Sequence, residues 1–101
     1  MKAARFLGEG RIAIEDAAEP VAGLDEVIVD VAACALCGSD FRPLRQGWPV
    51  TPGHEIFGRV RAPGTPAHGQ RVLVYIPTFC GQCAQCAAGR TNLCPRAELL
   101  G

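Results

Sequence analysis

Hydrophobic and polar residues alternate along five short stretches of the chain, and glycine or proline residues separate most of these stretches. Alternation with a period of two is typical of β-strands that bury one face. It predicts strands at residues 1–7, 11–15, 26–33, 56–61 and 70–76. Short strands joined by tight turns, without alternating strand–helix units, favour a mainly β fold built as an open antiparallel barrel.

The residues Gly8, Glu9 and Gly10 separate the first two predicted strands, which indicates an opening hairpin. Together with Ala13 they also spell G-x-G-x-x-A, the pattern of a dinucleotide-binding turn. Such a turn must open a helix. Here the strand-like alternation continues and Pro20 follows soon after, so the hairpin is the favoured interpretation.

Local signals predict the face of one strand and two short helices. The strand at residues 26–33 places its valines on one face, which we expect to be half-buried. Ser39 or Asp40 is placed to cap a short helix that Pro43 limits to about its first turn. A single helical turn at residues 83–88 would end at Gly89.

Length and charge narrow the class of protein. A chain of 101 residues is one domain, residues 1–101, with a modest core that a metal would help to hold. Ten basic and ten acidic residues cancel, which leaves no basic face for nucleic acid or anionic lipid. No apolar run approaches the roughly 20 residues that span a bilayer, and no signal peptide is visible. We therefore expect a soluble, cytoplasmic protein without nucleic-acid or membrane partners.

Four cysteines in the last quarter of the chain are spaced C-x2-C-x2-C-x7-C. They are Cys80, Cys83, Cys86 and Cys94. Four thiolates at such short spacing are typical of a closed, tetrahedral zinc site. Gly81 and Gly89 allow the sharp turns that would aim the sulfurs at one point. Zinc is the interpretation that this spacing favours.

Other interpretations of the cysteine cluster stay open. A bacterial iron–sulfur run is C-x2-C-x2-C-x3-C-P, and Pro95 follows Cys94 here, but the x7 spacer departs from it. A disulfide framework requires an oxidising compartment and a cysteine content of roughly 8–10% or more. The six cysteines of the chain fall below that range.

A second group of candidate ligands consists of Cys37 and the neighbouring pair His54 and Glu55. A thiolate and an imidazole form a mixed donor set that suits zinc. The residues alone do not decide the matter, because single cysteines and histidines more often serve packing and ordinary hydrogen bonding. Cys34 is interpreted in that way, as a small buried hydrophobic residue.

Motifs along the whole chain resemble those of the zinc-dependent medium-chain alcohol dehydrogenases. Those motifs are Cys37-Gly38-Ser39-Asp40, Gly53-His54-Glu55 followed by Gly58 and Gly64, Gly69-Gln70-Arg71-Val72, and the four-cysteine lobe. In the third motif Gln70 replaces the acidic residue usual in the family. The resemblance implies a mainly β, GroES-like open β-barrel with a cysteine-rich zinc-binding lobe at residues 78–96.

The resemblance also implies roles for individual residues. Cys37, His54 and Glu55 would surround a catalytic zinc ion, and the cysteine lobe would hold a structural one. Ser39 would accept the proton of the substrate hydroxyl, and Asp40 would fix the tautomer of His54. Glu55 would lie close behind the metal. The reaction implied is oxidation of a small-molecule alcohol or polyol by hydride transfer to NAD or NADP, in a protein expected to be a homo-oligomer.

Two departures from the family pattern stand out. Arg42 occupies the position at which many members carry a proton-relaying histidine, and a guanidinium cannot relay a proton. The chain ends at Gly101, before the third catalytic ligand and the Rossmann domain of the family. We therefore expect the N-terminal part of a dehydrogenase. The alternatives are a non-catalytic zinc-binding module and an iron–sulfur electron carrier. Trp48 has two open roles, in a substrate pocket or in packing.

Overall fold

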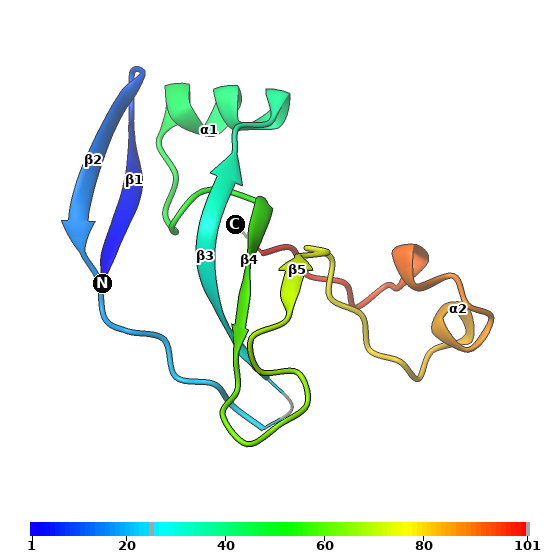
Figure 1. Ribbon diagram of the computed structural model, residues 1–101. Helices are drawn as coiled ribbons and strands as arrows, with labels where there is room; N and C mark the ends of the chain where they lie inside the picture. Colours follow the sequence, from blue (N-terminus) through cyan, green and yellow to red (C-terminus); the bar gives the residue numbers. More distant parts are fainter. Residues whose placement is uncertain (25, 101) are drawn as a thin grey trace.

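The computed structural model describes residues 1–24 and 26–100 as a mainly β molecule with a separate lobe around α2, from which the chain returns so that its C-terminus lies beside β3 and β4 (Figure 1). The strands are β1 (Lys2–Gly8), β2 (Arg11–Asp16), β3 (Ile28–Ala35), β4 (Glu55–Arg61) and β5 (Arg71–Leu73). The helices are α1 (Phe41–Gln46) and α2 (Ala84–Ala87), with 3-10 turns η1 (Gly38–Asp40) and η2 (Thr91–Leu93). The predicted mainly β class is confirmed.

The five strands form two antiparallel sheets, one of β1 and β2 and the other in the order β3-β4-β5. Within the described residues these sheets do not close into one barrel, so the arrangement is open. All five predicted strands are present, at shifted boundaries. No helix among the described residues is long and apolar enough to cross a membrane.

The opening hairpin follows the prediction, and helix α1 lies against its turn. Gly8, Glu9 and Gly10 all have positive φ angles, which the tight connection between β1 and β2 requires. The backbone N–H groups of Glu9 and Gly10 donate to the carbonyls of Arg45 and Leu44, at 2.9 and 3.1 Å. The G-x-G-x-x-A residues thus belong to a hairpin and open no helix, as the alternation predicted.

Strand β3 pairs closely with β4 because Gly58 has no side chain. A Cβ atom built on Gly58 would lie 2.6 Å from Val29 Cγ1 and would also collide with the carbonyl oxygen of Asp30. The register pairs Val31 with Gly58 and Ala35 with Glu55, across an irregularity between Val31 and Ala33. This register brings the end of β3 next to the start of β4.

Two strand predictions need correction. The valine face of residues 26–33 is not half-buried as a whole, because Val27 and Val31 are 52% and 59% exposed. No layer covers that face in the described part of the chain, whereas alternation assumes one. The strand predicted at residues 70–76 is only β5, because after Val74 donates to the Ile56 carbonyl the chain leaves the sheet for the lobe.

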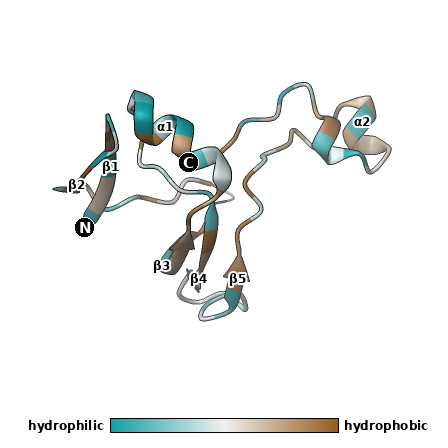
Figure 2. Ribbon diagram, turned by 90° about the horizontal axis from the view of Figure 1, so that it is seen from above, coloured by the Kyte–Doolittle hydropathy of each residue, from teal (hydrophilic) through white to brown (hydrophobic). Residues whose placement is uncertain are grey.

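Few side chains are deeply buried. Among the described residues the buried apolar positions are Ala3, Phe6, Val60 and Cys94. Figure 2 shows hydrophobic segments on all three strands of the larger sheet and on the strands of the hairpin. With so little apolar burial, other interactions must contribute to the stability of the fold.

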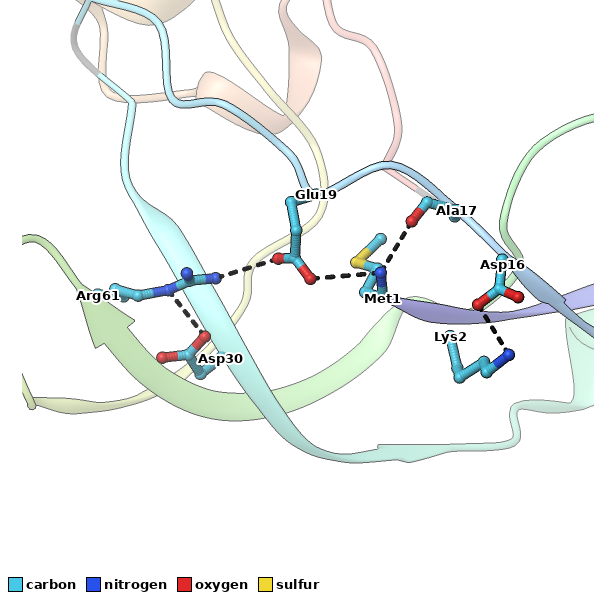
Figure 3. Close-up of polar contacts among 7 residues, drawn as sticks. All are labelled: Met1, Lys2, Asp16, Ala17, Glu19, Asp30 and Arg61. Carbon is cyan, nitrogen blue, oxygen red and sulfur yellow. Dashed lines mark hydrogen bonds and ion pairs between the residues drawn. The ribbon is translucent and has the colours of Figure 1, made fainter.

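Ion pairs connect the N-terminal hairpin to the larger sheet (Figure 3). The α-ammonium of Met1 lies 3.3 Å from the carboxylate of Glu19, which in turn lies 3.7 Å from the guanidinium of Arg61. Arg61 also pairs with Asp30 on the neighbouring strand at 3.0 Å. These groups are well exposed, so each pair contributes little to stability on its own.

Candidate metal centres

The cysteine lobe contains α2 and η2, and it joins the larger sheet through a narrow neck formed by residues 76–78 and 98–100 (Figure 1). Thr78 and Glu98 hold the two chain segments of the neck together. Thr78 N donates to the Glu98 carbonyl at 2.8 Å, and Glu98 N donates to Thr78 Oγ1 at 3.0 Å. Gly81 and Gly89 turn the chain within the lobe with φ angles of 72° and 75°. The predicted single helical turn is α2, and it ends before Gly89.

The lobe gathers all four predicted cysteines. The Sγ atoms of Cys80, Cys83, Cys86 and Cys94 lie within 4.8 Å of one another. Cys80 Sγ is 3.6 Å from Cys94 Sγ and 3.9 Å from Cys86 Sγ, and all six cysteines of the chain are free thiols. Four sulfurs converging on one point, without a disulfide, form a donor set that fits a tetrahedral zinc ion.

Backbone N–H groups and burial shift the pKa values of three of these thiols. The N–H groups of Gln82 and Cys83 lower the pKa of Cys80 to about 6. The N–H of Cys86 likewise lowers the pKa of Cys83. Burial, helped by the neighbouring thiol of Cys83, raises the pKa of Cys86 to about 12. The lobe therefore favours the thiolate, the form that binds a metal, at Cys80 and Cys83.

The second group of ligands forms where β3 and β4 meet. The Ala35–Glu55 pair ends the register, so Cys37, two residues beyond β3, comes to lie beside His54, directly before β4. The ligand atoms of Cys37, His54 and Glu55 lie within 4.8 Å of one another. A thiol, an imidazole and a carboxylate in this arrangement fit a zinc ion that keeps an open position.

The carboxylate of Asp40 holds two members of this group, Cys37 and His54, in place. Its carboxylate is 6% exposed and accepts a hydrogen bond from Cys37 N at 2.8 Å. The same carboxylate lies 3.4 Å from His54 Nδ1. It therefore favours a proton on Nδ1 and leaves Nε2 free as a ligand atom. Of the two residues expected to cap α1, Ser39 and Asp40, Asp40 occupies the N-cap position, but its side chain makes no capping hydrogen bond there and bonds back to Cys37 N across η1.

Hydrogen bonds also shift the pKa values of the ligands. Ser39, through its side chain and its backbone N–H, lowers the pKa of the Cys37 thiol, and His54 contributes in the same direction. The hydrogen bond to Cys37 raises the pKa of His54, with a further contribution from Asp40, against the opposing effect of burial. Ser39 Oγ lies 3.3 Å from His54 Nε2. Ser39 thus lies directly beside the ring nitrogen of His54 that could bind a metal.

A cavity of about 470 Å³ lies beside the ligand group. Its lining residues are Ser39, Asp40, Arg42, Pro43, Gln46, Trp48, Pro52, Gly53, His54, Ile76, Leu99 and Leu100. Trp48 thus lies in a pocket wall, one of the two roles open to it from sequence. Ile76, Leu99 and Leu100 come from the neck, and no local pattern in the sequence identified them. The spacing of Arg42 and Gln46, one helical turn apart on α1, could have identified their shared face.

Cys34 does not match its expected role. Its side chain is exposed, so it is not a buried hydrophobic residue. It lines a different cavity of about 560 Å³ on the other side of the Pro52–Gly53 segment. A Cβ atom on Gly53 would lie 2.7 Å from Cys34 Sγ, so a larger residue at position 53 would displace the backbone that precedes His54.

Known proteins resemble this chain in sequence and in structure. It is 36% identical to sorbitol dehydrogenase from Bacillus subtilis (strain 168), covering 99% of this chain and 32% of that protein. Galactitol-1-phosphate dehydrogenase from Escherichia coli has a similar structure, with a TM-score of 0.87, 28% identity and coverage of 100% of this chain and 32% of the other. A protein described as a short chain alcohol dehydrogenase, from Escherichia coli CFT073 and complexed with NADH, has a TM-score of 0.84 and 31% identity, with coverage of 100% of this chain and 32% of the other.

The chain spans about a third of the length of the curated relatives it matches. The family model for the alcohol dehydrogenase GroES-like domain matches residues 23–101. That match includes Cys37, His54 and all four cysteines of the lobe. Because it covers most of the chain, the chain belongs to the alcohol dehydrogenase GroES-like domain family.

Proposed function

We propose that this chain is the N-terminal catalytic-domain portion of a zinc-dependent dehydrogenase that oxidises an alcohol or polyol with NAD or NADP. The observation that carries the proposal is the convergence of the ligand atoms of Cys37, His54 and Glu55, with His54 in the wall of a cavity. Sorbitol dehydrogenase among the relatives supports a polyol substrate, and the relative complexed with NADH supports a nicotinamide cofactor.

The donor sets divide the work between two zinc ions. Cys37 and His54, with Glu55 beside them, would hold the catalytic ion, and the four cysteines of the lobe would hold the structural ion. Zinc with an open coordination position supplies Lewis acidity that makes an alcohol more acidic, and a nicotinamide cofactor supplies the hydride acceptor.

The side chains around the catalytic position have two roles: one orients the ring of His54, and another accepts a proton. Asp40 keeps the ring of His54 in one tautomer and one orientation through Nδ1. Ser39 Oγ, next to His54 Nε2, is placed to accept the substrate hydroxyl proton. Glu55 adds a negative charge at the same point. A guanidinium cannot relay a proton, so Arg42 takes no part in this transfer and the proton leaves Ser39 directly to water in the cavity.

The site residues, a homo-oligomeric state and a cytoplasmic location are predictions that follow from the family. Each has its own measurement: mutation for the residues, mass of the native particle for the assembly, and fractionation of cells for the location.

The proposed function is tested on the longest natural polypeptide that carries these residues, and its unsubstituted form is called the parent. The parent is expected to reduce NAD⁺ or NADP⁺ when sorbitol is added as the alcohol. Cys37→Ser is expected to lower the rate of this reduction about 1,000-fold or more. Cys34→Ser is the matched control, because Cys34 lies outside the ligand group, and should retain activity.

Metal content separates this function from its alternatives. Native mass spectrometry of the parent should find two zinc ions per chain. One ion per chain together with no alcohol-dependent reduction would instead identify a non-catalytic zinc-binding module. Visible absorbance and iron in the purified protein would identify an iron–sulfur electron carrier.

A further inference from the structure

Helix α1 places one basic residue in the wall of the cavity next to the ligand group. Arg42 and Gln46 are one helical turn apart and both line this cavity. Arg42 Nε donates a hydrogen bond to Gln46 Oε1 at 3.1 Å. This bond orients the guanidinium and leaves its two terminal nitrogens without a partner in the described residues.

Of the two charged side chains that line the cavity, Asp40 and Arg42, only Asp40 has partners that balance its charge. Asp40 already accepts from Cys37 N and lies against His54. Arg42, in contrast, forms no ion pair within the part of the chain that the structure describes. It is therefore the one permanently positive side chain in the cavity wall and has no acidic partner there.

We propose that Arg42, oriented by Gln46, binds an anionic oxygen group, a phosphate or carboxylate, of the molecule that occupies this cavity. The terminal nitrogens of a guanidinium form a planar fork that matches two oxygens of such a group. The remaining walls, among them Pro43, Trp48 and Ile76, are mainly apolar and suit the carbon skeleton between the anionic group and the reacting hydroxyl.

This inference deepens the proposed function and rests on it for the position of the reacting carbon beside Ser39 and His54. Two molecules could present the anionic group. One is the substrate, which would then be an alcohol phosphate or a hydroxy acid. The other is the nicotinamide cofactor, whose phosphates have the same oxygen chemistry. The binding of an anion by Arg42 is common to both, and the experiment separates them.

The experiment uses the fluorescence of Trp48, which is the only tryptophan of the chain and lines the same cavity. The zinc-loaded chain is titrated with inorganic phosphate and with acetate at low ionic strength. We expect a saturable change in emission, and an apparent Kd about tenfold higher in Arg42→Gln, because a hydrogen bond to a charged group is lost. Added sodium chloride should weaken binding to the parent.

The matched control is Arg45→Gln, which removes the same charge from the same helix at a position that does not line the cavity. It should bind phosphate within about twofold of the parent, because only long-range charge is lost in water. Arg42→Lys keeps the charge without the planar fork and should fall between the parent and Arg42→Gln.

Two larger probes identify the source of the anion. Sorbitol 6-phosphate carries the group on a polyol, and nicotinamide mononucleotide carries it on the cofactor half that reacts. If Arg42→Gln weakens the binding of sorbitol 6-phosphate, the anionic group belongs to the substrate. If it weakens the binding of nicotinamide mononucleotide, the anionic group belongs to the cofactor.

Three results would overturn the inference. They are equal phosphate binding by the parent and Arg42→Gln, an equal effect of Arg45→Gln, and a loss of neutral sorbitol binding as large as that of sorbitol 6-phosphate. Zinc content is measured on every sample. If two zinc ions are bound but Arg42 binds no anion, only this inference fails; if the Cys37 group binds no zinc, the proposed function fails.

Discussion

Asp40 is the one charged side chain that is buried in the described part of the chain, and it contacts two of the three candidate ligands, Cys37 through its backbone N–H and His54 through Nδ1. A buried carboxylate is costly unless it is hydrogen-bonded or paired. Here Cys37 N and His54 Nδ1 satisfy it. The same contacts that satisfy the carboxylate also fix the positions of a sulfur and a nitrogen, so burial and function depend on one residue.

Asp40→Asn should therefore weaken zinc binding at the Cys37–His54 group about 10–100-fold, because the amide no longer holds the His54 ring by charge. A competitive titration against a chromophoric chelator measures this affinity. The zinc ion of the lobe should be retained, which shows that the chain is still folded. Asp16→Asn is the control, because Asp16 pairs only with exposed Lys2. Equal affinity in Asp40→Asn and the parent would contradict the role of Asp40.

The cysteines of the lobe should react at very different rates once the metal is removed. With a pKa of about 6, Cys80 is mostly thiolate at pH 7, whereas Cys86, with a pKa of about 12, is almost entirely thiol. Allowing for the weaker nucleophilicity of the more acidic thiolate, Cys80 should be alkylated by iodoacetamide on the order of 100 times faster. Peptide mass spectrometry of the metal-free, reduced chain measures both rates.

The pH dependence of this reaction has a defined sign. The pKa of Cys80 is lowered, so its thiolate is present above about pH 6 and is lost as the pH falls through that value. Its alkylation should slow about tenfold between pH 7 and pH 5. Similar rates for Cys80 and Cys86 at pH 7 would mean that the backbone N–H groups do not favour the Cys80 thiolate.

At the scale of elements, the site depends on the pairing of β3 with β4. Their register brings Cys37 and His54 together although 16 residues separate them in the sequence. Gly58 permits the close approach of the two strands next to an irregularity in β3. A change at this pair therefore acts on the catalytic position without touching any of its ligands.

Gly58→Ala should destabilise the zinc-loaded chain by about 1–3 kcal/mol, because its Cβ would overlap Val29 and the Asp30 carbonyl. For a domain of this size, that corresponds to a fall of about 4–8 °C in Tm for each kcal/mol. Thermal unfolding followed by circular dichroism measures it. Gly38→Ala is the matched control, since no atom lies within 4 Å of its added Cβ. Equal Tm values for the two variants would refute the packing argument.

Alternation in the sequence predicted the existence of all five strands because it is a local property of each strand. It did not predict which face is covered, because burial of Val27 and Val31 depends on a layer that the alternation cannot reveal. The cysteine lobe was predictable from spacing, since its ligands lie within one short segment. Cys37 and His54 needed the family resemblance, because strand register brings them together. The neck residues of the cavity, such as Leu99, carried no sequence signal that assigned them to the cavity.

At the scale of the whole molecule, the two candidate metal centres lie in regions with few connections. Helix α2 contacts only η2 among the elements of the described residues, and both lie apart from the strands in Figures 1 and 2. The neck, with Thr78, Glu98 and a bridge between Pro77 and Leu99, joins the two regions. Cys94 is the one deeply buried apolar side chain of the lobe. The lobe therefore lacks a hydrophobic core that could hold it as firmly as a bound metal would.

For such a region, metal binding contributes much of the free energy of folding. Cys94→Ser should therefore remove one zinc ion per chain and make the folded lobe open more often, while the β3–β4 pair keeps its hydrogen bonds. Hydrogen–deuterium exchange should speed up about tenfold or more at residues 80–94 and change little at β3 and β4. Cys34→Ser, with its thiol outside both ligand groups, should behave like the parent. Equal acceleration in β3 and β4 would mean that the neck transmits unfolding, and that the lobe and the sheet are one cooperative unit.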